Sequence, residues 1–448
     1  MKKLLKRIIP IIFLVPLFTG TIGYLIAGEK LTDSLYASFA LFFTNPVSDA
    51  YNYYIEAARW TAPLVTATAI LCALQKVWNS IYDRFYLLGR KDSVAVYSDE
   101  ECEILFDKKV KAIYPGENFK SYAKSHIIMF SNDQKSMEFY RIHKKDLKGK
   151  KVYIGIRNIE LGLFDEVEQV ELFDVNSTIA RLLWKELAVW KEQKETMDIV
   201  ICGNGTLAET ILSSGLQLNL FSLKQKLKYH FISDSMQYQI RHANMNLMNA
   251  DEIHYYTFSD LHIWDVISNA DVVIVADRMD SGLMQTLVVR ARDKKIYYYS
   301  PKDGDVESYI SFGSLIPFGR TEEVYTDDNI RRKSLIQNAI ALNKQYADQY
   351  GSEGDWNKLA GFFKASNISS ADYGEVLAFL TDGTKEEELS ELEHIRWCRF
   401  YLLNYYVLGK EKDNKKRIHK DLVPYGQLTE EEKKKDRDTI NLTRRISG

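Results

Sequence analysis

The sequence contains little cysteine and proline and has no surplus of charge, and each shortage excludes a class of protein. The cysteines Cys72, Cys102, Cys202 and Cys398 form no CxxC pair and have no Cys/His spacing, which argues against a disulfide framework and a structural zinc site. Eight prolines and 23 glycines in 448 residues exclude a collagen-like or linker-dominated chain. Because Lys plus Arg total 59 against 61 Asp plus Glu, we expect no nucleic acid partner.

The apolar and charged fractions, 46% and 27%, are typical of globular protein. A length of 448 residues suggests about three modules, since a domain usually takes roughly 150 residues.

The first 80 residues carry two apolar segments. Residues 8–27 are uncharged and follow four cations, and their length suits a helix that crosses about 30 Å of hydrocarbon. A signal peptide also begins with cations, but its apolar run is shorter and ends in a clean A-x-A site, which is missing here. A second apolar segment covers about 58–80. Cations precede the first segment and follow the second, which predicts two spans in the inner (plasma) membrane with both termini cytoplasmic.

A shorter apolar and aromatic stretch, about 34–43, lies between the two segments and ends in Thr44-Asn45-Pro46. We expect a pore helix there, with Thr44, Asn45 and Pro46 lining the path of a permeating ion. An interfacial helix in an external loop is the alternative. The order of span, pore helix and span over residues 1–88 resembles the pore module of two-span potassium channels, which implies a homotetramer. No TVGYG-like run is present, so the resemblance does not imply potassium selectivity.

Residues 92–195 show the alternation of β-branched runs and amphipathic helices that is typical of parallel α/β folds. We expect strands at 93–97, 126–130 and 152–156, and a closing helix from Asp174 to about Trp190. The first strand runs into Ser98-Asp99-Glu100 without a glycine. This argues against dinucleotide binding by the first module, because the backbone cannot approach a pyrophosphate closely.

The second module, 196–330, has the features that the first one lacks. Its first strand leads directly into Gly203-Asn204-Gly205-Thr206, a G-x-G-x-x-A turn that opens a helix. Free N–H groups at such a helix start bind phosphate, so we expect these residues to bind a nucleotide. Asp234, at the end of the next strand, is a candidate ribose ligand, and Asp277 lies at a third strand end. The alternative is a glycine turn that only packs the helix on the strand.

No Cys/His or Lys/Tyr pair near this turn suggests hydride chemistry, so we expect no enzyme, no catalytic residue and no metal site. The tandem modules over about 92–330, with the glycine turn and the ADVVIVADRMDSG segment, resemble the RCK (Trk-type nucleotide-binding) gating domains of ligand-gated potassium channels. That resemblance implies a ring of modules that opens or closes a pore.

The last part of the chain, 331–448, contains a helical linker and a more specific pattern. The order EH-x-RW, H-x-DLVPY-x-x-L and EKKKDRD over about 385–445 resembles the RyR domain, a small helical repeat named for the ryanodine receptor. Aromatic faces beside guanidinium groups suit a nucleotide, whose base stacks while its phosphates pair with arginine. The expected ligand-binding residues are Arg396, Trp397, Tyr401, Tyr405, Arg417, Tyr425 and Arg437. The alternative is that the aromatics are core.

Together these features predict a membrane protein with two transmembrane helices and a pore helix, two α/β Rossmann-like domains and a small all-α RyR-like domain. The predicted function is a homotetrameric ion channel gated by NAD, an adenine nucleotide or a cyclic or ADP-ribose-type messenger. The resemblances imply a role as an antiviral (antiphage) defence effector. The alternatives are a housekeeping RCK-regulated potassium channel or transporter, and a non-conducting, membrane-anchored nucleotide-binding or interaction protein.

Overall fold

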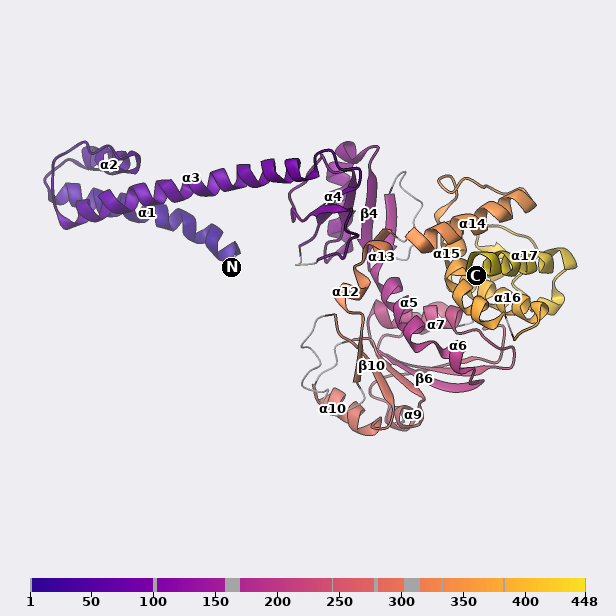
Figure 1. Cartoon of the computed structure of the whole chain (residues 1–448). Helices are drawn as coiled ribbons and strands as arrows, with labels where there is room; N and C mark the ends of the chain where they lie inside the picture. The colour runs from indigo at the N-terminus through magenta and orange to yellow at the C-terminus, as the bar shows by residue number, and fades with distance from the viewer. Residues whose placement is uncertain are drawn as a thin grey trace. The chain divides into compact units, whose positions relative to one another are not determined.

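A computed structural model describes residues 2–99, 103–157, 170–243, 245–277, 281–301, 315–331, 333–381 and 383–447 (Figure 1). The chain divides into two compact units, Met1–Arg90 and Lys91–Gly448.

The first unit is helical. It contains α1 (Lys2–Ile26), α2 (Leu31–Ala40), the 3₁₀ turn η1 (Leu41–Phe43) and α3 (Tyr53–Leu87). Two glycines let α1 approach its neighbours closely: a Cβ on Gly20 would lie 2.9 Å from Ser38 Oγ, and one on Gly23 would lie 2.7 Å from Ile55 Cγ1. Asn52 then fixes the start of α3, because its side chain accepts a hydrogen bond from Ile55 N and donates one to Gly23 O.

No helix in the part of the chain that the structure describes is long and apolar enough to span a bilayer. The predicted membrane protein with spans at about 8–27 and 58–80, and its placement in the inner membrane, were therefore wrong. In α3 the charges of Arg59 and Lys76 limit the uncharged stretch to residues 60–75, or about 24 Å of helix. The first predicted span falls partly on residues 1–13, whose side chains lie outside those described.

The predicted helix at 34–43 is present as the end of α2 plus η1. It ends because Thr44 adopts a left-handed backbone conformation with φ of 55°. Thr44, Asn45 and Pro46 form the exposed turn that follows. Their expected role in a pore depended on the two spans.

The second unit begins with a parallel five-stranded sheet. Its strands are β1 (Ser93–Tyr97), β2 (Lys111–Ile113), β3 (Ser125–Ile128), β4 (Lys151–Ile156) and β5 (Val170–Asp174). Their order is β2-β1-β3-β4-β5, and α4 (Asp133–Leu147) connects β3 to β4. The three predicted strands are confirmed to within two residues, and burial of apolar runs such as Val94–Tyr97 explains why they form.

A second parallel sheet follows, with six strands in the order β11-β10-β9-β6-β7-β8. Numbered from β6, this is the 3-2-1-4-5-6 order of doubly wound nucleotide-binding folds. The strands are β6 (Thr196–Cys202), β7 (Lys226–Ile232), β8 (Glu252–Tyr256), β9 (Val272–Val275), β10 (Lys295–Tyr299) and β11 (Leu315–Phe318), and the helices between them are α7 (Thr206–Leu218), α8 (Gln237–His242), α9 (Ile263–Asn269) and α10 (Ser281–Arg290). The predicted α/β class is confirmed.

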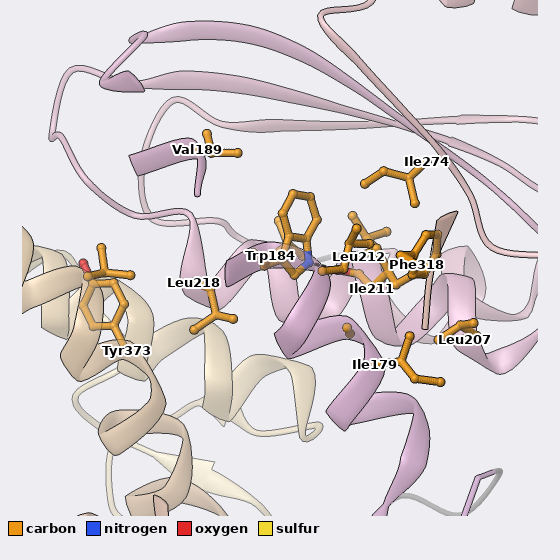
Figure 2. Packing of buried hydrophobic residues seen from close by; sticks show 14 of the residues in the cluster. Ile179, Trp184, Val189, Leu207, Ile211, Leu212, Leu218, Ile274, Phe318 and Tyr373 are labelled. Carbon is orange, nitrogen blue, oxygen red and sulfur yellow. Dashed lines mark hydrogen bonds between the residues drawn. The ribbon is translucent and has the colours of Figure 1, made fainter. Parts of the chain in front are cut away.

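The two sheets are joined through α5 (Val175–Leu187), which packs against α7 (Figure 2). Trp184 of α5 is buried in the contact between α5 and α7 and donates a hydrogen bond from Nε1 to Ile211 O. Gly215 makes this contact possible, since a Cβ there would lie 2.6 Å from Trp184 Cζ2. The predicted closing helix ends early at Ala188, whose φ is 44°, and α6 (Val189–Glu192) follows.

The C-terminal region is mainly helical, as predicted, and its helices α14 to α17 pack on one another (Figure 1). It contains α12 (Thr321–Val324), α13 (Asp327–Arg331), α14 (Lys333–Tyr350), α15 (Gly361–Leu380), α16 (Glu386–Leu403), β12 (Val407–Leu408), β13 (Ile418–His419), η3 (Tyr425–Gln427) and α17 (Glu430–Ser447). The prediction of an all-α domain was wrong in one respect, because β12 and β13 pair as a short parallel sheet.

Candidate functional site

The glycine turn connects β6 to α7 at the carboxyl edge of the second sheet. Gly203 donates a hydrogen bond from N to Ile232 O, and a Cβ there would lie 2.9 Å from Ala208 Cβ. Gly203 therefore allows β6 and α7 to pack closely against each other. Gly205 is the N-cap residue of α7, and, as a glycine, it has no side chain of its own to cap the helix start. The first N–H groups of α7 thus need another acceptor.

Asp277, just beyond β9, supplies an acceptor for the turn. Its Oδ2 accepts hydrogen bonds from Asn204 N and from Gly205 N, the latter at 3.1 Å. A Cβ on Gly205 would lie 3.1 Å from Asp277 Oδ1, so the carboxylate fills the space beside the glycine. The anion at this turn is a side chain of the protein itself.

The neighbouring strand end joins the same cluster. Asn204 Oδ1 accepts hydrogen bonds from Ser233 Oγ at 3.1 Å and from Asp234 N at 2.7 Å. Asp234 Oδ1 in turn accepts one from Phe258 N at 3.0 Å. The ends of β6, β7 and β9 are thereby tied together, and the order of these strands reverses between β6 and β9.

Thr206 faces the first module. Its Oγ1 accepts a hydrogen bond from Asn176 Nδ2 at 3.0 Å and lies 3.4 Å from Arg157 O. The first residue of α7 therefore links the two sheets, a contact that the spacing of the motif could not indicate. The segment that follows Asp277, residues 278–280, lies outside the described residues.

The first module has a related arrangement that the sequence did not reveal. Asp99, after β1, accepts hydrogen bonds from Ser131 N at 2.8 Å and Ser131 Oγ at 2.9 Å, and pairs with Lys135 Nζ at 3.2 Å. Burial alone would raise the pKa of Asp99, but these hydrogen bonds outweigh it and lower the pKa. The signal in the sequence was an aspartate directly after a strand, without a glycine.

In the C-terminal region, Arg396 is buried and already paired. Its Nε and Nη2 donate to the two carboxylate oxygens of Glu393 at 2.7 and 2.8 Å, and Nη1 donates to Ser369 Oγ at 2.7 Å. With 1% of its surface exposed, this guanidinium has no open face for a phosphate.

Trp397 and Tyr401 lie four residues apart on the same face of α16, with ring centroids 4.3 Å apart. Their surroundings include His394 and His419. His394 Nε2 lies 2.8 Å from Val423 O. Burial lowers the pKa of His394, but hydrogen bonds with Asp436 and Cys398 outweigh it and raise the pKa to about 11. This cluster is a largely buried aromatic core around His394.

The other four expected residues occupy two separate places. Tyr405 lies beyond the end of α16 with φ of 64° and stacks on His242, and Arg417 lies 6.0 Å from its ring. Tyr425 and Arg437 meet at Glu387, which accepts a hydrogen bond from each at 3.1 Å. Tyr425 also packs beside His394, with ring centroids 5.9 Å apart.

No pattern in the sequence indicated how tightly the C-terminal region is joined to the second sheet. Arg399, with no exposed surface, donates hydrogen bonds from α16 to Leu216 O, Leu247 O, Asn249 Oδ1 and Asp251 Oδ2, at 2.6–2.9 Å. Tyr373 of α15 donates to Leu220 O at 2.5 Å. The C-terminal end of α7 and the loop after it are thus held by α15 and α16.

A cavity of about 50 Å³ lies between α14, α15 and α17 beside Tyr346, Tyr350 and Lys435. A nucleotide needs several times that volume. Among the described residues, no group of three His, Cys, Asp or Glu side chains could hold a metal ion.

Comparison with protein families agrees with one of the resemblances. Residues 383–446 match the RyR domain family, and this range covers α16, β12, β13, η3 and nearly all of α17. The predicted RyR domain is confirmed. No family match supports the resemblance to Trk-type nucleotide-binding domains or to a channel. A search of curated proteins found no match to the chain.

Proposed function

We propose that the chain is a nucleotide-binding protein whose site lies at the glycine turn of the second sheet, with the RyR domain attached to that module. The observation that carries the proposal is the convergence of Gly205, Asp234 and Asp277 at adjoining strand ends, where the strand order reverses. Open parallel sheets bind ligands in this position.

The chemistry of the site favours a nucleotide with an exposed ribose. A phosphate oxygen would accept hydrogen bonds from the N–H groups at the start of α7, whose positive dipole end lies there. The exposed Asp234 would accept hydrogen bonds from ribose hydroxyls. These features suit NAD, an adenine nucleotide or an ADP-ribose-type messenger. The strand order also supports the finer proposal that the module is of the Trk nucleotide-binding type.

The RyR domain is the second candidate for the ligand, and Arg396 weighs against it. Its guanidinium is satisfied by Glu393 and Ser369, so phosphate binding there would have to break a buried ion pair. The proposal therefore assigns ligand binding to the second sheet and a responding role to the RyR domain. Assembly into a homotetramer is part of the proposal, and light scattering on the full chain tests it.

Isothermal titration of the full chain with NAD, ADP-ribose, AMP and ATP tests the site. Gly205→Val should abolish binding, since its side chain would enter the space that the phosphate and Asp277 share. Gly383→Val is the matched control, because a Cβ at Gly383 meets nothing within 4 Å. Asp234→Asn should weaken binding roughly tenfold, because a charge-assisted hydrogen bond contributes about 1.5–3 kcal/mol.

Thermal melting of each variant separates lost binding from lost folding. Equal affinity in Gly205→Val and in the unmodified chain would reduce the turn to a packing contact. Binding that survives there but is lost on Arg417→Met would move the ligand to the RyR domain.

A further inference from the structure

We propose that the Asp277 carboxylate is an internal ligand of the glycine turn, which occupies the phosphate position and which phosphate-bearing ligands must displace. This inference rests on the proposed function and specifies how the same site is regulated. We refer to the contact of Asp277 with the N–H groups of Asn204 and Gly205 as the Asp277 cap.

The geometry of the cap is that of a bound anion. One carboxylate oxygen accepts both N–H groups, and the other lies against Gly205 where a side chain would otherwise be. Beside the cap, the neutral side chain of Asn204 accepts a hydrogen bond from Ser233 Oγ at 3.1 Å. A phosphate on the same donors would lie beside this carboxylate, and two like charges at that distance repel. Phosphate and Asp277 therefore bind in competition.

The first module shows a capped turn in which a cation holds the carboxylate in place. Asp99 follows β1 and accepts hydrogen bonds from Ser131, which follows β3, at the point where the strand order of that sheet reverses, and Lys135 pairs with it at 3.2 Å. The lysine itself is held by Glu117 at 2.8 Å. Among the described residues, the hydrogen bonds to Asp277 come from the backbone N–H groups of Asn204 and Gly205, which can equally donate to a phosphate oxygen. The second module thus has an exchangeable anion where the first has a fixed one.

Competition with the cap has a consequence that depends on the ligand. A ligand with phosphates must displace Asp277, whereas adenosine can contact Asp234 without reaching the turn. Removal of the carboxylate should therefore increase affinity for ADP-ribose and leave affinity for adenosine unchanged.

The experiment is isothermal titration of ADP-ribose and adenosine into the full chain, Asp277→Ala and Asp277→Asn. We expect both variants to bind ADP-ribose at least tenfold more tightly than the unmodified chain, with adenosine affinity within twofold. Asp277→Asn covers the case in which Asp277→Ala does not fold, since its amide oxygen can still accept from the turn.

Asp271→Ala is the matched control. Asp271 lies at the opposite end of β9 and also accepts a backbone hydrogen bond, from Asp198 N at 2.9 Å. The Asp271→Ala substitution should change neither the affinity for ADP-ribose nor the affinity for adenosine. ADP-ribose binding that is unchanged or weaker in both Asp277 variants would overturn the cap while leaving the proposed function intact. Absence of ADP-ribose binding in the unmodified chain and in both Asp277 variants would overturn both.

Discussion

The contact most open to a quantitative test is the buried Arg399, which joins α16 to the second sheet. Asp251, its ionic partner, has no exposed side-chain surface and also accepts hydrogen bonds from Leu227 N and Gln225 Nε2. Arg399→Met keeps the apolar stem but leaves the Asp251 carboxylate without a counter-charge. Breaking a buried pair in this way costs about 3–5 kcal/mol.

Hydrogen exchange of the α16 and α7 amides is the suitable assay, because a chain with several modules need not unfold in one step. At 1.36 kcal/mol per decade, we expect protection to fall by roughly 10²–10⁴-fold in Arg399→Met. Asp251→Asn added to that variant removes the unpaired charge and should restore part of the loss, so the two effects should not add.

The matched control for this prediction is Arg437→Met. Arg437 pairs with Glu387 and Glu430 at the surface of the protein, and exposed pairs contribute less than about 1 kcal/mol. A loss of protection under tenfold in Arg399→Met, or strict additivity with Asp251→Asn, would refute the assigned role of Arg399.

Two further predictions concern the cores of the sheets. Gly215→Ala should destabilise the protein by about 1–3 kcal/mol, measured as a lower melting temperature, because its methyl group would overlap Trp184; Gly383→Ala should have no such effect. His126 should make the first sheet acid-sensitive, since burial, aided by Lys150, lowers its pKa to about 4. The pKa of His126 in the folded protein lies below the unfolded value of about 6.5, so the free energy of unfolding is unaffected by this group above pH 6.5 and decreases as the pH falls towards 4. His126→Phe should remove this pH dependence in thermal melts between pH 7.5 and 4.5. An unchanged pH profile in that variant would contradict the assignment.

The alternation of strands and helices could be predicted because burial of a parallel strand demands a continuous apolar run, and runs such as 93–97 are visible in the sequence. The glycine turn could also be predicted, because the close packing of β6 and α7 requires a glycine at position 203 and that glycine is visible in the sequence. The second span was not correctly predicted, because the apolar character of α3 is interrupted by Arg59 and Lys76. Hydropathy of a segment does not state how many consecutive residues remain free of charge.

The RyR-domain residues show a different limit of sequence reasoning. The four-residue spacing of Trp397 and Tyr401 places them on one face of α16, but the helix ends at Leu403 and Tyr405 adopts a positive φ. Spacing also could not tell whether Arg396 faces a ligand or Glu393, because both outcomes fit a helix. Long-range contacts such as that of Asp277 with Gly205, 72 residues apart, decide whether a polar side chain binds a ligand or substitutes for one.

The position of α7 leads to the last prediction, which concerns coupling between the glycine turn and the RyR domain. The helix has 13 residues, or about 20 Å, with the turn at one end and the hydrogen bond from Arg399 to Leu216 O near the other. Loss of that hydrogen bond should loosen the C-terminal turn of α7 and so weaken ligand binding at its start. Coupling free energies between sites are typically about 1–3 kcal/mol, so Arg399→Met should weaken ADP-ribose binding roughly fivefold or more in titration calorimetry. By linkage, saturating ADP-ribose should also raise the exchange protection of α16 in the unmodified chain. Affinities within twofold of each other, together with unchanged protection of α16, would show that α7 does not connect the two regions.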